Sequence, residues 1–106
     1  MFEKAIKAAF GDPDEERTAE RQLMALRQTG SASSYAVKFR QVSSSLEWKD
    51  EPLMVAFYAG LKAEVKDELA KIDRPKEFAQ YVAIAVRIDD RLYERRMERK
   101  GQQQRV

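Results

Sequence analysis

The chain has 106 residues, of which 43% are hydrophobic and 36% are charged, and this composition suits one small domain. It contains no cysteine and no histidine, which excludes disulfides and removes the commonest metal ligand and general base. No apolar run approaches the roughly 20 residues of a membrane span, and charges interrupt the N-terminal stretch where a signal peptide would be apolar. We therefore expect a soluble protein of the reducing cytoplasm.

The net charge of +2 is unevenly distributed along the chain. Residues 1–86 carry 13 Lys and Arg against 14 Asp and Glu, whereas residues 87–106 carry 7 against 4. A nearly neutral body does not strongly oppose self-association. The basic C-terminal end indicates either a nucleic-acid contact or a solvated helix end, and the sequence leaves both readings open.

The spacing of apolar residues predicts an all-α protein, a compact bundle of five to six short helices without strands. Proline and glycine occur only at the junctions between these segments. The pattern ends at Leu92, and we expect one domain over residues 1–98 and a disordered, basic and Gln-rich tail over 99–106. The expected helices span about residues 2–10, 12–28, 32–46, 50–60, 62–71 and 76–98.

Two helix starts have clear sequence signals. Asp12 and Pro13 suit the cap and first turn of the second helix, and the acidic residues after them suit the helix dipole. Gly30 ends that helix, and either Ser31 or Ser33 can cap the third.

The predicted core consists of apolar residues at helical spacing together with one tryptophan. Trp48 is expected to cover the turn between the third and fourth helices, although an interface role was an alternative for it. The predicted core residues are Leu23, Leu26, Tyr35, Phe39, Val42, Leu46, Trp48, Leu61, Leu69 and Ile88.

Several short segments occur in an order and at spacings that are typical of one protein family. They are Phe10-Gly11-Asp12-Pro13, Ala19-Glu20-Arg21, Gln28-Thr29-Gly30-Ser31, Tyr35-Ala36, Phe39-Arg40, Trp48, Phe57-Tyr58, Gly60-Leu61-Lys62 and Ile88-Asp89-Asp90-Arg91-Leu92. Together they resemble the capsid region of the Gag polyprotein of gypsy-type long-terminal-repeat retrotransposons. The resemblance covers about residues 2–99 and is to the second, C-terminal capsid lobe, which is similar to the C-terminal lobe of the domesticated protein Arc.

The resemblance implies a retroviral capsid C-terminal-domain-like fold and a structural role. Such a domain homodimerises and links capsomers, together with an N-terminal lobe, into the lattice of a virus-like particle in the cytoplasm. The dimer helix of the related orthoretroviral domains corresponds here to residues 50–60, and the chain-end helix over residues 2–10 is a second candidate. The candidate interface residues are Phe2, Ile6, Met54, Phe57 and Tyr58.

The segment from Gln28 to Trp48 resembles a diverged orthoretroviral major homology region. Where that region places a glutamate in its turn, this chain has serine and alanine, so the hydrogen bonds of the turn remained an open question. We expect Arg40 either to bond this turn, as the resemblance implies, or to be solvated.

The alternative function is nucleic-acid binding through the basic end of the chain. Its candidate residues are Arg95, Arg96, Arg99 and Lys100, but interspersed glutamates and the lack of stacking aromatics favour only weak RNA contact. A peptide-binding adaptor role, by similarity to Arc, belongs to the other lobe. We find no arrangement typical of an active site, and expect no enzyme activity, no cofactor, no metal, no membrane contact and no small-molecule substrate.

Overall fold

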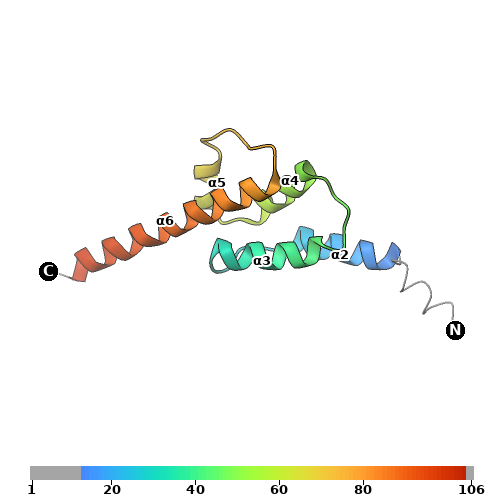
Figure 1. Cartoon of the computed structure of the whole chain (residues 1–106). Helices are drawn as coiled ribbons and strands as arrows, with labels where there is room; N and C mark the ends of the chain where they lie inside the picture. The colour runs from blue at the N-terminus through green and yellow to red at the C-terminus, as the bar shows by residue number, and fades with distance from the viewer. Residues whose placement is uncertain (1–12, 105–106) are drawn as a thin grey trace.

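The computed structural model describes residues 13–104, and within that range every regular element is a helix. The helices are α2 (Pro13–Ala25), α3 (Ala32–Ser43), α4 (Asp50–Gly60), α5 (Ala63–Leu69) and α6 (Phe78–Gln104). In Figure 1, α2 and α3 lie side by side in one layer, and α4, α5 and the first half of α6 form the other. The predicted all-α bundle is confirmed, whereas the helix expected over residues 2–10 lies outside the described range.

One helix start follows a local signal in the sequence, and another depends on a distant residue. Ser31 caps α3, because its side-chain oxygen accepts a hydrogen bond from the Ser34 amide at 3.1 Å. The start of α6 is fixed from a distance, since the Phe78 amide donates to Asp50 Oδ2 at 3.2 Å. Asp50 therefore ties the first turn of α6 to the first turn of α4.

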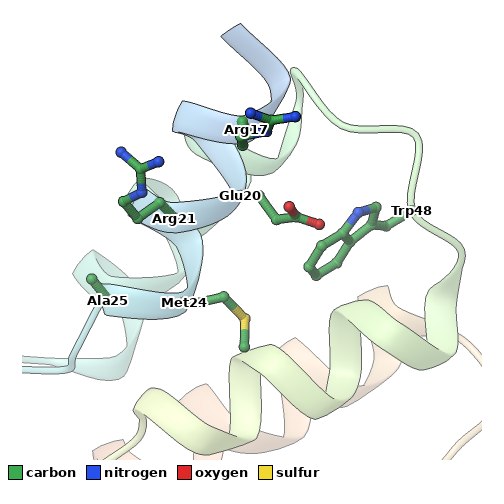
Figure 2. Close-up of a pocket in the computed structure, with 6 residues that line it drawn as sticks. All are labelled: Arg17, Glu20, Arg21, Met24, Ala25 and Trp48. Carbon is green, nitrogen blue, oxygen red and sulfur yellow. The ribbon is translucent and has the colours of Figure 1, made fainter. Parts of the chain in front are cut away.

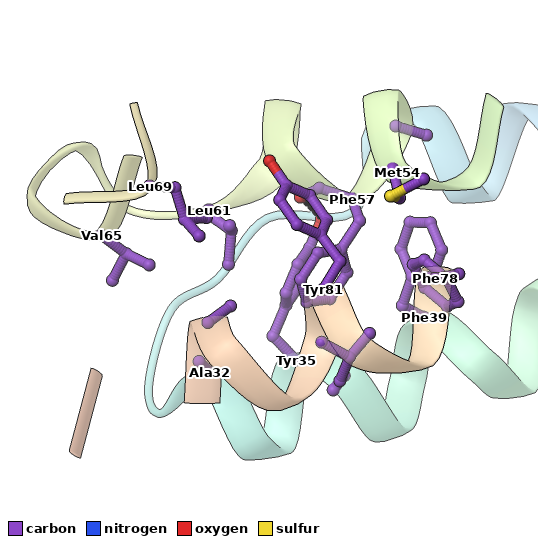
Figure 3. Close-up of a cluster of buried hydrophobic side chains, with 14 of the residues drawn as sticks. Ala32, Tyr35, Phe39, Met54, Phe57, Leu61, Val65, Leu69, Phe78 and Tyr81 are labelled. Atoms are coloured by element: carbon purple, nitrogen blue, oxygen red, sulfur yellow. Dashed lines mark hydrogen bonds between the residues drawn. The ribbon is translucent and has the colours of Figure 1, made fainter. Parts of the chain in front are cut away.

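The core is a cluster of five aromatic rings from three helices (Figure 3). Phe57 lies at its centre, with its ring centroid 5.3 Å from Phe39 and 5.5 Å from Phe78, both at edge-on angles that aromatic pairs favour. Tyr35 packs 5.1 Å from Phe57, and Tyr81 completes the cluster. Since Phe57 belongs to α4, this helix lies at the centre of the packing.

The predicted core residues all lie in or against the wider hydrophobic core around these rings. Five of them are buried, namely Leu23, Tyr35, Phe39, Leu61 and Leu69. The other five are partly buried and pack against the buried set, namely Leu26, Val42, Leu46, Trp48 and Ile88.

Helix α6 differs from the expectation at its C-terminal end. It continues to Gln104, so the predicted change to a disordered tail at residue 99 does not occur over residues 99–104. Arginine, lysine and glutamine are good helix formers, and the single Gly101 is not sufficient to end the helix. Every residue from 93 to 101 is exposed, and this half projects beyond the bundle in Figure 1.

None of the helices in the described part of the chain combines the length and the apolar character that a membrane span requires.

Candidate self-association surface

Helix α4 is apolar on both of its sides, which is unusual for a helix at the surface of a small domain. It begins with acidic residues, Asp50 and Glu51, that suit the positive end of the helix dipole, and Pro52 is tolerated in this first turn. After them every residue up to Gly60 is apolar or aromatic. An ordinary surface helix would place charges opposite its buried stripe.

The inner side of α4 contains two of the predicted interface residues. Met54 is 2% exposed and Phe57 is 0% exposed, and both belong to the core of this same chain. A side chain that its own chain covers completely leaves no surface for a second copy to contact. The assignment of Met54 and Phe57 to a dimer interface is therefore corrected: they are core residues.

The outer side of α4 carries an exposed apolar strip. Val55 is 56% exposed, and Pro52 and Ala59, three residues before it and four after it, are exposed as well. Residues at these spacings lie on one face of a helix. Val55 was not selected from the sequence, although its spacing of three residues from Pro52 and four from Ala59 places all three on one face of a helix.

We call this strip, together with the neighbouring Tyr58, the α4 outer face (Pro52, Val55, Tyr58 and Ala59). Charged side chains border it. Tyr58, the third predicted interface residue on this helix, is half-buried, and the Lys66 ammonium lies 5.7 Å from its ring centroid. At the start of the helix, Glu51 pairs with Arg74 at 3.3 Å. An apolar centre with a mixed-charge rim is the usual anatomy of a protein–protein interface.

The remaining two predicted interface residues, Phe2 and Ile6, lie outside the residues that the structure describes. The described residues include no group of three or more His, Cys, Asp or Glu that could hold a metal ion.

The turn before α3 is held by a buried polar network in addition to the Ser31 cap. Gln28 and Asp89 are the two buried polar side chains among the described residues, and the Gln28 amide nitrogen donates to Asp89 Oδ1 at 3.1 Å. The other carboxylate oxygen, Oδ2, accepts the Ala32 backbone amide at 2.9 Å. An aspartate in α6 thus supplies the acceptor for the Ala32 amide.

Gln28 extends this network to the end of α4. Its backbone amide donates to the Gly60 carbonyl at 2.7 Å, and its side-chain oxygen accepts the Lys62 amide at 3.0 Å. Both Gln28 and Asp89 belong to the segments that carry the resemblance, but their contact across 61 positions was not predicted from the sequence. Arg40 is exposed and forms no side-chain bond to this turn within the described residues, so its solvated alternative is the one observed.

The basic end of α6 is partly neutralised. Arg96 pairs with Glu64 of α5 at 2.6 Å, and Arg95 pairs with Glu98 one turn further along. Arg99 and Lys100 are exposed and have no ion pair within the described residues. Two of the four candidate nucleic-acid residues are therefore in ion pairs and two are not, and RNA contact there stays an untested prediction.

The comparison with known families identifies one that spans most of this structure. The family described as "PEG10/RTL1, C-terminal capsid-like domain" matches residues 19–92, more than two thirds of the chain. The matched span runs from α2 to the buried half of α6 and contains both the α4 outer face and the Gln28–Asp89 network. The match confirms the predicted resemblance to a Gag-derived capsid C-terminal domain.

Proposed function

Because the chain belongs to the PEG10/RTL1 C-terminal capsid-like domain family, we propose that it is a structural module through which copies of the protein join in a capsid-type shell. The observation that supports the proposal is the α4 outer face, which remains exposed and apolar after the chain has packed its own core. A second copy of the same face is the occupant that we propose for it.

The geometry suits a two-fold contact. When one face meets a copy of itself, each residue near the axis meets its own counterpart, and Val55 lies at the centre of the strip between Pro52 and Ala59. The contact removes the exposed Val55 side chain from water and leaves the Lys66 and Arg74 side chains at the rim. A strip of one helix is small, so the contact is weak singly and gains strength when many copies are linked.

The proposal is tested by the mass of the protein at sedimentation equilibrium over a wide concentration range. We expect a concentration-dependent dimer that persists in high salt, because an apolar contact is not screened. The variant Val55→Asp places two carboxylates against each other at the axis and should remain monomeric at every concentration. Its melting temperature should stay near that of the native chain, since Val55 makes little contact with the core.

Val37 provides a matched control on another helix. It lies in α3 and is 55% exposed, almost the same as Val55, so Val37→Asp makes an equal change of charge and hydrophobicity at a different surface. Val37→Asp should dimerise as the native chain does. The proposal fails if the native chain is monomeric throughout, or if both variants weaken the dimer equally.

A further inference from the structure

The α4 outer face has a carboxylate at one end and an ammonium group at the other. At the start of α4, the Glu51 side chain is 77% exposed and pairs with Arg74 at 3.3 Å. Beyond the middle of the helix, the Lys66 ammonium lies 5.7 Å from the ring centroid of Tyr58. The exposed Val55 lies between these two charges. A second copy of the face therefore meets different charges in different orientations.

Glu51 and Tyr58 lie nearly in line along α4. They are seven residues apart, which is close to two full helical turns, and Pro52 and Ala59 form a second line at the same spacing. Val55 lies between the two lines, because it follows Glu51 by four residues and precedes Ala59 by four, and each such step advances about 40° around the helix. Along the axis, Glu51 lies about 6 Å before Val55 and Tyr58 about 4.5 Å after it. Glu51 and Tyr58 are thus almost equally far from Val55, on one flank of the face.

We propose that two copies pack their α4 outer faces antiparallel, so that Glu51 of each copy meets Tyr58 and Lys66 of the other. This inference rests on the proposed self-association of the face. A two-fold axis that crosses α4 at a right angle at Val55 reverses the direction of the helix and keeps each flank on its own side. Glu51 of the second copy then lies within about 1.5 Å of the level of Tyr58 along the axis. The symmetry forms this contact twice in each dimer.

A parallel arrangement does not form these contacts. A two-fold axis that runs along α4 keeps the direction of the helix and exchanges the two flanks. Glu51 then faces Pro52 of the second copy, and Tyr58 with its neighbouring Lys66 faces Ala59, so neither charge meets an opposite one. The like partial charges of the two helix ends also come together. The charges of the face therefore favour the antiparallel arrangement.

Glu51 can contact Lys66 of a second copy without losing its own partner. Arg74 binds one of the two carboxylate oxygens, Oε2, and most of the Glu51 side chain remains in water. Exposed ion pairs add little affinity, whereas like charges that meet across an interface oppose it. We therefore assign Glu51 and Lys66 to the orientation and specificity of the contact, and Val55 to its apolar centre.

Charge reversal tests this assignment. In a dimer of Glu51→Lys chains two ammonium groups meet at each contact, and in a dimer of Lys66→Glu chains two carboxylates meet. We expect each variant alone to raise the dimer dissociation constant about tenfold at low salt, measured by sedimentation equilibrium. An equimolar mixture of the two variants restores opposite charges at both contacts. The mixture should therefore dimerise nearly as tightly as the native chain, and the melting temperatures should stay near the native value.

The matched control is a second pair of reversals with the same net charges. Glu20→Lys and Arg21→Glu change exposed residues of α2, in the other layer of the bundle. Figure 2 shows both residues at the open hollow of about 540 Å³ that Met24 and Trp48 also line. Each control variant should dimerise as the native chain does, and their mixture should show no preference for mixed dimers.

The outcomes separate this inference from the proposed function. A native chain that is monomeric throughout removes the self-association, and the orientation with it. A native dimer that Val55→Asp abolishes, but whose charge-reversed variants do not recover on mixing, overturns the antiparallel arrangement and leaves the proposed function intact. Equal recovery in the control mixture means that net charge is the cause, and this result also overturns the inference.

Discussion

Both sides of helix α4 are apolar, but one side faces the core and the other faces water. Met54 on the inner side packs among aromatic rings, whereas its chain neighbour Val55 on the outer side is mostly exposed to water. Hydrophobicity alone does not separate them, since both residues are apolar and stand side by side in the sequence. The comparison separates two kinds of apolar residue: those that stabilise the monomer and those that remain available to a partner.

The difference between the two sides is tested most directly by placing the same negative charge on each of them. Met54→Asp buries a carboxylate without a partner, which costs several kcal/mol, and a domain of this size has only about 5–15 kcal/mol of stability in total. We expect Met54→Asp to abolish the cooperative thermal transition in circular dichroism. Val55→Asp should keep that transition and lose only the dimer, and if the two variants melt alike the inner and outer assignments are wrong.

Gly60, at the end of the inner side, is expected to give the next largest effect. A Cβ atom there would overlap the Tyr35 hydroxyl and lie 2.5 Å from the Leu26 carbonyl oxygen, so Gly60→Ala forces α3 and α4 apart. We expect a loss of about 2–3 kcal/mol in the free energy of unfolding, measured by urea denaturation. The displacement would also strain the Gln28 amide that donates to the Gly60 carbonyl.

Gly101 is the matched control for this substitution. No atom lies within 4 Å of a Cβ built on it, and it occurs in the exposed half of α6. Gly101→Ala should therefore raise stability, by about 0.5–1 kcal/mol at most, since alanine loses less backbone entropy in a helix. A loss for Gly101→Ala equal to that of Gly60→Ala would mean that close packing at Gly60 is not the cause.

The sequence was sufficient for the helices and the core because their signal is periodic. Tyr35, Phe39 and Val42 recur at spacings of four and three residues, which marks one side of α3 as the buried side. In α4 the run from Leu53 to Ala59 has no polar residue, and periodicity therefore cannot say which side faces inward. Met54 and Phe57 were assigned to the interface because the resemblance places the dimer helix at residues 50–60, while the helix itself remains our candidate.

Contacts between residues that are distant along the chain could not be predicted from sequence patterns. Asp89 belongs to one of the segments that carry the resemblance, but its role appears only when the fold brings it to Gln28 and to the start of α3. The end of α6 shows the converse limit. Loss of apolar residues after Leu92 correctly marked the end of burial, but burial and helix are different properties, and the helix continues in water.

Alkaline pH should weaken the packing on the inner side of α4. Tyr35 donates its hydroxyl proton to the Phe57 carbonyl at 3.0 Å. Burial raises the pKa of Tyr35 from 10.0 to about 12, and the positive charge of Arg27 only partly opposes this rise. A raised pKa means that the folded chain holds the proton more tightly than the unfolded chain. The stabilisation is therefore complete below pH 10 and is lost as the pH rises towards 12.

The expected loss over that window is about 2 kcal/mol in the free energy of unfolding, from the proton linkage of a single group. Urea denaturation at pH 9.5 and at about pH 11.5 measures it, with Tyr35→Phe as the variant that has no proton to lose. Burial also raises the pKa of Tyr81, with Arg74 opposing, so Tyr35→Phe should keep only the part of the pH dependence that Tyr81 contributes. An unchanged dependence in Tyr35→Phe would place the alkaline sensitivity elsewhere and remove Tyr35 from the contacts that hold α4 inward.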